Sequence, residues 1–333
     1  MSLSRINNLK KLFRIIPFVS RIFKKELFTR NLYLNKGIKY KNRTIPYYPL
    51  GEGNLQIKEL LLSGKPAMIT RYGSVELEII NKFYLHYPVF IKKELMTDFC
   101  HTAGFFPYDK TLVPQFVYLY KNSAKEIDVL AIWNSFHGRT AEAKLIKQWS
   151  SNAIMVDLLS LESFWYTEPW SECLRDKKVL LILPFEKSAR YQYEHNRERL
   201  FSNSNVLPQF RSFQIIAPHQ GIGMSSTGGY NTWFDAFDDI CSKITSADFD
   251  IAIIGAGAYG LPLAAQVKKM GKQAIHMGGA TQLLFGIKGK RWEVEPWYLY
   301  QYKLYNEYWK RIEQDETPTN TKTFEAGMQG GYW

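Results

Sequence analysis

Two clusters of residues in this chain have the types and the spacing suited to binding a phosphorylated ligand. The first is the segment 71–76, RYGSVE, in which an arginine and a glutamate flank a glycine. The second is the segment 255–260, GAGAYG, which follows an apolar run and precedes a helix-like pattern. Glycines at a strand-to-helix turn let the backbone approach a ligand closely, and the free N–H groups of the helix N-terminus then face its phosphates. The two segments are therefore candidate parts of a nucleotide site.

Glycines and cations that follow the second cluster add positive charge to it. A glycine pair ends the next predicted strand, and three cations stand close together in the loop beyond it. Arginine and lysine side chains neutralise a diphosphate leaving group, although a solvated basic turn is the alternative interpretation. The residues expected to bind the nucleotide are Gly73, Ser74, Gly255, Gly257, Tyr259, Gly260, Gly278, Gly279, Gln282, Lys288, Lys290 and Arg291.

Three residues are the candidate catalytic groups. Glu76 follows a glycine turn, where a carboxylate binds a divalent cation or acts as a base. Arg71 is placed to pair with Glu76 or with a phosphate, and His276 ends a predicted strand beside the glycine turn. The alternatives are that Glu76 only stabilises a helix N-terminus and that His276 only forms hydrogen bonds.

An NAD or FAD cofactor is not expected, although the 255–260 turn matches GxGxxG. A dinucleotide fold places an acidic residue on the ribose at the end of the second strand. Here that strand ends in His276-Met277-Gly278-Gly279, without an acid, and the motif lies in the last quarter of the chain. A nucleoside diphosphate is the better-supported ligand, and glycines that serve only helix–strand packing remain the alternative.

Strands and helices are expected to alternate along most of the chain. Apolar runs predict strands at 67–70, 127–133, 153–156, 178–183, 213–217, 249–254 and up to 277. Helical patterns follow at 55–63, from 74, at 140–149, 186–200, 232–245 and up to 270. This alternation predicts an α/β fold with a Rossmann-like, mostly parallel sheet or sheets flanked by helices.

The chain is expected to divide into three parts. Residues 1–50 form a basic N-terminal helix and an irregular lead-in, and residues 51–165 form a first α/β half that contains Arg71 to Glu76. Residues 166–333 form a second α/β half with the glycine-rich turn and an aromatic C-terminal tail. The aromatic, turn-like stretch 160–177 is the expected joint.

The basic charge of the chain is concentrated at its start. The formal net charge is +12, yet residues 1–50 hold twelve Lys and Arg against the single acid Glu26, so the remainder is nearly neutral. A broad nucleic-acid-binding face is therefore not expected. Apolar positions in residues 3–29 recur at helical spacing between cations, which predicts an amphipathic helix, kinked at Pro17, on an anionic membrane surface. A helix packed on the body or on another subunit is the alternative.

Cysteine usage and hydropathy indicate the compartment. The three cysteines are far apart and have no metal spacing, which favours a reducing cytoplasm. No secretory signal and no apolar run of membrane-spanning length, about 20 residues, is present in the sequence. We expect a cytoplasmic protein, peripheral on the inner face of the plasma membrane.

The motifs RYGSVE (71–76) and GAGAYG…AIHMGGATQLLFGIKGKRW (255–292) resemble bacterial polysaccharide-biosynthesis proteins of the GT-D glycosyltransferase type. AGFFP (103–107), PW (169–170), ILPFEKS (182–188), NRERLF (196–201), VLP (206–208) and the terminal GGYW extend the resemblance over about residues 60–333. It implies a GT-D-like Rossmann sheet and a sugar nucleotide, with donor and metal binding at an R-F-G-D-G-E element. Arg71, Gly73 and Glu76 match that element, whereas Ser74 replaces its Asp. A lone carboxylate with a hydroxyl is a poorer site for Mn²⁺ or Mg²⁺.

The leading hypothesis is a glycosyltransferase that moves a sugar from a nucleoside-diphosphate sugar to a surface-glycan acceptor, such as a capsule, a lipopolysaccharide or a lipid-linked glycan. Mn²⁺ or Mg²⁺ at Glu76 is the cofactor that this hypothesis allows. The alternatives are a non-catalytic nucleotide- or glycan-binding assembly protein and, less favoured, a dinucleotide-dependent oxidoreductase.

Overall fold

The computed structural model describes residues 38–40, 43–45, 47–85, 91–133, 139–219, 228–294, 301–317 and 331–332. The predicted amphipathic helix at 3–29, with its membrane contact, lies outside these ranges. Among the helices inside them, none combines the length and the apolar character needed to cross a membrane.

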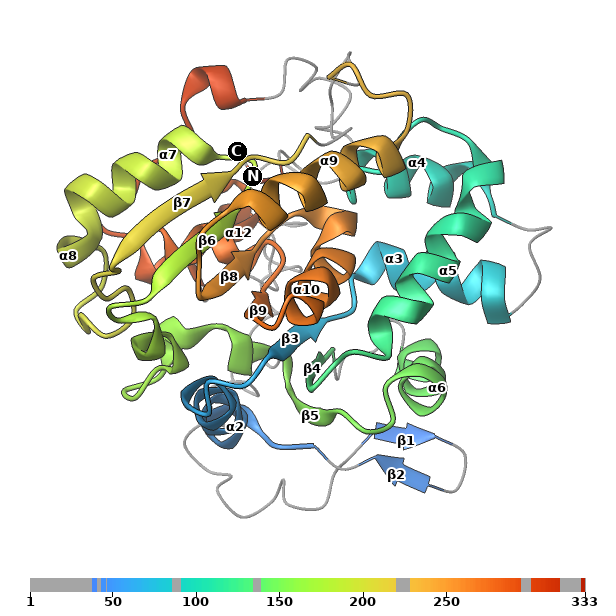
Figure 1. Ribbon diagram of the computed structural model, residues 1–333, viewed down its shortest axis with the longest axis horizontal. Helices are drawn as coiled ribbons and strands as arrows, with labels where there is room; N and C mark the ends of the chain where they lie inside the picture. Colours follow the sequence, from blue (N-terminus) through green and yellow to red (C-terminus); the bar gives the residue numbers. More distant parts are fainter. Residues whose placement is uncertain are drawn as a thin grey trace, which may run out of the picture.

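Seven parallel strands form one sheet through the centre of the molecule (Figure 1). Their order is β5-β4-β3-β9-β8-β6-β7, and every neighbouring pair is parallel. Their bounds are β3 Ala67–Arg71, β4 Val129–Ile132, β5 Ile154–Asp157, β6 Lys178–Ile182, β7 Ser212–Ile216, β8 Ile251–Ile254 and β9 Gln273–His276. A separate antiparallel pair is formed by β1 (Ile38–Tyr40) and β2 (Arg43–Ile45).

Helices pack on both faces of this sheet and bury two apolar cores. One core is covered by α3 Ser74–Ile80, α4 Lys93–His101, α5 Val113–Ala124, α6 Arg139–Trp149, α9 Trp233–Ser246 and α10 Gly260–Lys269. The other is covered by α2 Leu50–Leu62, α7 Glu186–Tyr191, α8 Arg197–Leu200, α11 Ala280–Leu284 and α12 Arg291–Val294. Side chains of β9 alternate between the two, because Ala274 belongs to the first core and Ile275 to the second. The predicted α/β fold with a parallel sheet is confirmed.

Helix α2 begins earlier than its sequence pattern predicts. It starts at Leu50 rather than Leu55 and takes in Gly51 and Gly53. A side chain at Gly53 would collide with Ser160, so the glycine allows the helix to pack closely on the chain that follows β5. Close packing of the backbone, which no helical periodicity reveals, explains why a glycine-containing stretch is helical here.

The last strand, β9, lies in the middle of the sheet, between β3 and β8. It pairs with β3 through Ala67 opposite Gln273 and with β8 through Ile254 opposite His276. Strands from residues 51–165 and from residues 166–333 are thus hydrogen-bonded into one sheet. Because parallel strands end at the same edge, the residues that follow β3 and β9 lie next to each other, and ligands bind at this edge in open α/β sheets.

Candidate functional site

Arg71, the last residue of β3, is the centre of the candidate site. Its guanidinium lies 5.0 Å from the centre of the Trp133 ring, which follows the neighbouring strand β4. On its other side it touches Gly278, where an added Cβ would lie 2.6 Å from Arg71 Nε. That Nε atom is buried without a hydrogen-bond partner. Across the described ranges Arg71 forms no ion pair, so a partly buried cation is held in place but is not neutralised by direct contact.

Two buried glutamates that sequence analysis missed lie within the electrostatic reach of Arg71. Burial raises the pKa of Glu142 to about 7, against hydrogen bonds from the Trp133 backbone N–H at 3.2 Å and the positive charge of Arg71. Burial also raises the pKa of Glu162 to about 7, against hydrogen bonds from Trp165 and Gln301 and the same charge. Each glutamate comes after a strand that ends at this edge, Glu142 after β4 and Glu162 after β5. That position alone does not distinguish them from other acids that follow strands.

Glu76 lies in the first turn of α3 and is 6% exposed. Its carboxylate is turned back over Gly73, because a side chain at Gly73 would collide with it. Burial raises the pKa of Glu76, while the charge of Arg71 acts to lower it. The backbone N–H of Gly73 donates to the Tyr120 hydroxyl at 3.2 Å, which fixes the turn between β3 and α3. The structure therefore places Glu76 and Arg71 in one site, as the sequence motif predicts.

The residues around Glu76 do not fit a divalent cation. Ser74, which stands where the resembled motif has Asp, is exposed, while the Glu76 carboxylate is buried over Gly73. In the part of the chain that the structure describes, no three His, Cys, Asp or Glu side chains are grouped as metal ligands. Mg²⁺ and Mn²⁺ favour several oxygen ligands, which this donor set does not supply.

The 255–260 turn is closely packed and its donors are largely used within the protein. The N–H of Gly255 donates to the carbonyl of Ile182 at 2.9 Å, and that of Ala258 donates to the carbonyl of Ala103 at 2.8 Å. Tyr259 is fully buried, with its ring stacked on Trp233 at 4.4 Å. The geometry thus agrees with the packing alternative at this turn, where only Gly257 is partly exposed.

His276 fills the space between β9 and α10. It is 2% exposed, its Nδ1 lies 3.0 Å from the Thr70 hydroxyl, and its Nε2 is directed at Gly260. A side chain at Gly260 would collide with the ring. Burial lowers the pKa of His276 to about 3, and the charge of Arg71 acts in the same direction. The imidazole is therefore neutral at physiological pH and is part of the core.

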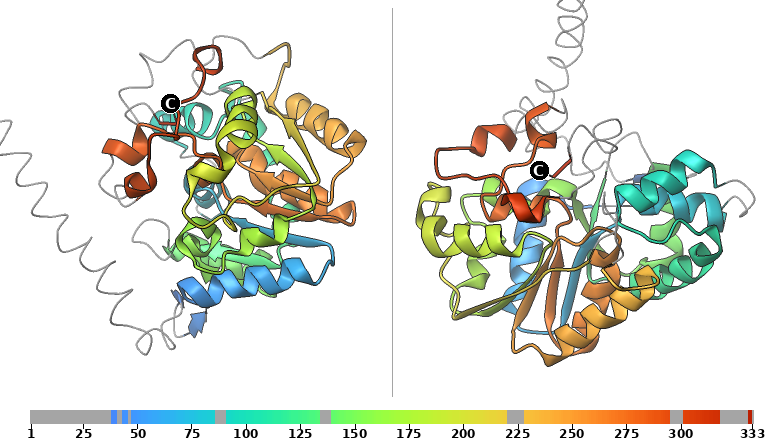
Figure 2. Two further views of the ribbon diagram at one scale, coloured as in Figure 1. Left: turned by 90° about the vertical axis from the view of Figure 1, so that its left-hand side faces the viewer. Right: turned by 90° about the horizontal axis from the view of Figure 1, so that it is seen from above.

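The Gly278–Gly279 turn brings a second guanidinium to the site. Tyr332, near the C-terminus, packs on Gly279, and the Arg291 guanidinium lies 4.8 Å from the centre of the Tyr332 ring. Backbone and side-chain hydrogen bonds hold this segment. The Arg291 N–H donates to Gly331 at 3.1 Å, and Gln282 donates to the Tyr332 carbonyl at 3.0 Å. Figure 2 shows the C-terminal segments (red) gathered along one side of the molecule.

The predicted nucleotide-binding residues therefore fall into separate groups. Gly278 contacts Arg71, while Gly279, Gln282 and Arg291 all contact Tyr332. Gly73 lies beside Glu76. Lys288 instead lies over the ring of Tyr305 at 5.7 Å, and Lys290 is exposed. Trp133 and Tyr332 were missed, since aromatic residues carry no pattern that distinguishes a cation platform from ordinary core packing.

Comparisons with known proteins give matches among solved structures alone. No family model matches the chain, and a search of curated proteins finds no match. A domain of unknown function 1792, described as having a distinct glycosyltransferase fold, shares 15% identity over 70% of this chain and 78% of that one, with a TM-score of 0.40. A glycosyltransferase (DUF1792) from Streptococcus sanguinis shares 11% identity over 71% and 82%, with a TM-score of 0.42. A selenomethionine-substituted structure of the DUF1792 domain shares 15% sequence identity over 71% of this chain and 79% of that one, with a TM-score of 0.40.

These neighbours fall in the class of protein that the sequence motifs resemble. Their sequence identities and TM-scores are low, so neither a fold nor an activity is carried over from them to this chain. The function of this chain has to follow from its own residues.

Proposed function

We propose that the protein is a glycosyltransferase that uses a nucleoside-diphosphate sugar as donor. The observation that carries this proposal is Arg71, a partly buried guanidinium at the carboxyl edge of a parallel sheet that forms no ion pair with any residue the structure describes. This guanidinium is held by an aromatic ring and a glycine and not by a carboxylate, so its hydrogen-bond donors and charge are available to an anionic ligand.

The diphosphate binds at the Gly278–Gly279 turn, between the guanidinium groups of Arg71 and Arg291. Gly278 has a φ of +63° and no side chain, which lets Arg71 lie directly on the backbone. Arg71 lies on Gly278, and Arg291 lies over Tyr332, which packs on Gly279. The charge of the two arginines stabilises the diphosphate as it leaves the sugar. Because the donor set at Glu76 does not fit a divalent cation, no step of the reaction is assigned to a metal.

Glu76 is the acceptor's base in this proposal. The acceptor hydroxyl oxygen bonds to the anomeric carbon, the bond from that carbon to the diphosphate oxygen breaks, and the hydroxyl proton goes to the Glu76 carboxylate. A carboxylate whose pKa is raised by burial is a stronger base than an exposed one. His276, which is neutral and buried, acts as a packing residue.

Binding of donor is the first test. UDP-, GDP-, ADP- and dTDP-sugars are screened for an increase in melting temperature, and the best of them is then measured by calorimetry. Replacing Arg71 with Lys or Ala should weaken binding about 10- to 100-fold, since a charge-assisted hydrogen bond contributes about 1.5–3 kcal/mol. Arg175→Lys, at an arginine that bonds Asn205 on the surface, is the matched control and should leave binding unchanged.

Turnover separates this proposal from a non-catalytic binding protein. Release of the free nucleotide from the donor, with or without an acceptor glycan, should fall strongly in Glu76→Gln while donor binding persists. If no sugar nucleotide stabilises the protein, or if Arg71→Ala binds the donor normally, the proposed function is wrong. Binding without any release of nucleotide favours the assembly-protein alternative.

The membrane contact is a second part of the proposal. The basic, amphipathic pattern of residues 3–29 would bring the enzyme to a bilayer where lipid-linked acceptors are found. Co-sedimentation with phosphatidylglycerol vesicles should be lost when residues 1–30 are deleted. Equal sedimentation of the shortened and full chains would contradict it.

A further inference from the structure

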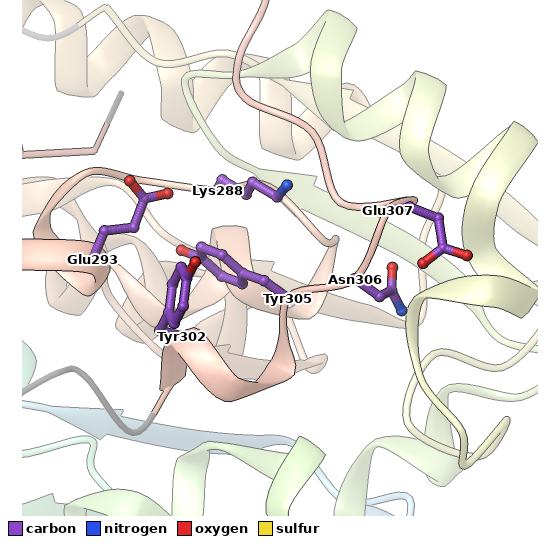
Figure 3. A pocket seen from close by; sticks show the side chains of 6 residues that line it. All are labelled: Lys288, Glu293, Tyr302, Tyr305, Asn306 and Glu307. Carbon is purple, nitrogen blue, oxygen red and sulfur yellow. The ribbon is translucent and has the colours of Figure 1, made fainter.

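A cavity of about 550 Å³ lies in the C-terminal part of the chain, and neither Trp133 nor Gly278 is among its lining residues (Figure 3). This volume is within the usual range for small-molecule sites, about 300–1,000 Å³. No aliphatic side chain is among its lining residues, which are Lys288, Glu293, Tyr302, Tyr305, Asn306 and Glu307.

The two tyrosines give the cavity one fixed and one open aromatic surface. Their ring centres lie 5.3 Å apart at an interplanar angle of 61°. The Tyr305 hydroxyl lies 3.3 Å from the Gly289 backbone N–H, and burial raises the pKa of Tyr305 to about 12. Tyr302 is 54% exposed, so much of its ring is available to a ligand.

Charged groups of both signs surround these rings. In Figure 3 Glu293 and Glu307 lie at opposite ends of the cavity, with the tyrosines and Lys288 between them. Glu293 is oriented by Arg311, whose Nη2 lies 2.5 Å from its Oε2. Lys288 Nζ lies 5.7 Å from the centre of the Tyr305 ring. The cavity thus combines aromatic surface with strong hydrogen-bond donors and acceptors.

This combination selects one chemical class of ligand, and we infer that the cavity is a saccharide-binding subsite. A pyranose ring packs its C–H face against an aromatic ring, here Tyr302, while its hydroxyls donate to carboxylates and accept from an ammonium group. A phosphate is repelled by the two glutamates, and an apolar ligand makes no hydrogen bond to the charged groups that line the cavity.

The subsite is connected to the Arg71 site through one buried hydrogen bond. Tyr302 belongs to the 3₁₀ helix Gln301–Leu304, and Gln301 donates to Glu162 at 2.8 Å. Glu162 is one of the carboxyl groups on which the charge of Arg71 acts. We therefore assign the bound saccharide as the acceptor glycan, and this assignment rests on the proposed function. The inference that the cavity binds a saccharide does not depend on it.

Saturation-transfer NMR on the full chain tests the subsite with four probes, namely maltotriose, cellotriose, triacetylchitotriose and mannotriose. At least one should bind, and Tyr302→Ala should weaken its binding about five- to tenfold. The control Tyr118→Ala removes another exposed tyrosine, on α5, where Tyr118 is 70% exposed, and should leave binding unchanged. Glu307→Gln, at an exposed carboxylate of the cavity, should also weaken binding without a change in melting temperature.

The inference is overturned if none of the four probes binds, or if the binding survives Tyr302→Ala. Donor binding, followed by thermal shift with the same variants, keeps the two proposals apart. Tyr302→Ala should leave donor binding unchanged. If this variant loses donor binding together with saccharide binding, the cavity is not a site distinct from the donor site. If no sugar nucleotide binds, the proposed donor is wrong, but the result of the saccharide-binding experiment remains valid.

Discussion

The Arg71 guanidinium is held at the site without a direct ion pair to any residue that the structure describes. Trp133 and Gly278 hold its guanidinium from two sides, and Glu76, Glu142 and Glu162 act on it from a distance. A direct, buried Arg–Glu pair would be costly to separate, about 3–5 kcal/mol. Spreading the compensation over three carboxyl groups leaves the arginine free to bind an incoming phosphate.

Donor binding should weaken as the pH rises through about 7. Glu142 and Glu162, whose pKa values are raised to about 7, are protonated and neutral below this pH and become anionic above it. Added negative charge near Arg71 opposes an anionic ligand. A sugar diphosphate does not titrate in this range, so calorimetry from pH 5.5 to 8.5 reports the protein groups.

The double variant Glu142→Gln, Glu162→Gln should bind the donor with little dependence on pH over that range. Each single substitution, Glu142→Gln or Glu162→Gln, should reduce the pH dependence of donor binding in part. If the affinity of the unmodified protein for the donor stays constant or rises between pH 6 and 8, the electrostatic role given to these carboxyl groups is contradicted.

At the scale of elements, the two glycine turns differ although they look alike in the sequence. Gly255 and Gly260 allow close packing on Thr281 and His276. Gly278, by contrast, provides the surface on which Arg71 lies. A glycine pattern shows that the backbone needs room, but not whether a side chain or a ligand fills that room. For this reason the sequence named glycines of both turns as candidates, and our proposal places the phosphate at Gly278 and not at the 255–260 turn.

Gly278→Ala should abolish most donor binding through Arg71. Its φ of +63° is strained for alanine, at about 1–2 kcal/mol, and its Cβ would also lie within 2.5 Å of Arg71 Nη2. Gly64→Ala is the matched control, because Gly64 has a φ of +66° and no atom within 4 Å of an added Cβ.

The two alanine variants should lose similar stability in chemical denaturation, and only Gly278→Ala should lose affinity for the donor in calorimetry. Equal donor affinity in both would show that Gly278 has no part in positioning Arg71.

At the scale of the whole molecule, most of the fold was predictable and much of the site was not. The strand and helix patterns are local, and all seven strands of the parallel sheet were expected. Glu142 and Trp133 come close to Arg71, and Tyr332 comes close to Gly279, only because distant strands and the C-terminus meet at one edge, which no local pattern encodes. The pairing of β3 with β9 was likewise invisible in the sequence, since strand order is set by packing of the complete chain.

The shared sheet predicts one cooperative unfolding transition. Ile275, fully buried in the central strand β9, should lose about 2–5 kcal/mol of stability on replacement by Ala, and tryptophan fluorescence and far-UV circular dichroism should shift together. Ile154→Ala, on the edge strand β5 where Ile154 is 38% exposed, is the control and should cost far less. Two separate transitions would instead support independent units that divide near residue 165.

The central place of β9 also affects the protein while it is being made. Ribosomes deliver β3 and β8 before β9, so each of these strands has an unpaired edge during the synthesis of the chain that separates them from it. Open, apolar strand edges attract other chains, and partly folded α/β proteins aggregate through them. The sheet therefore keeps open edges until residues 273–276 emerge and join the two groups of strands.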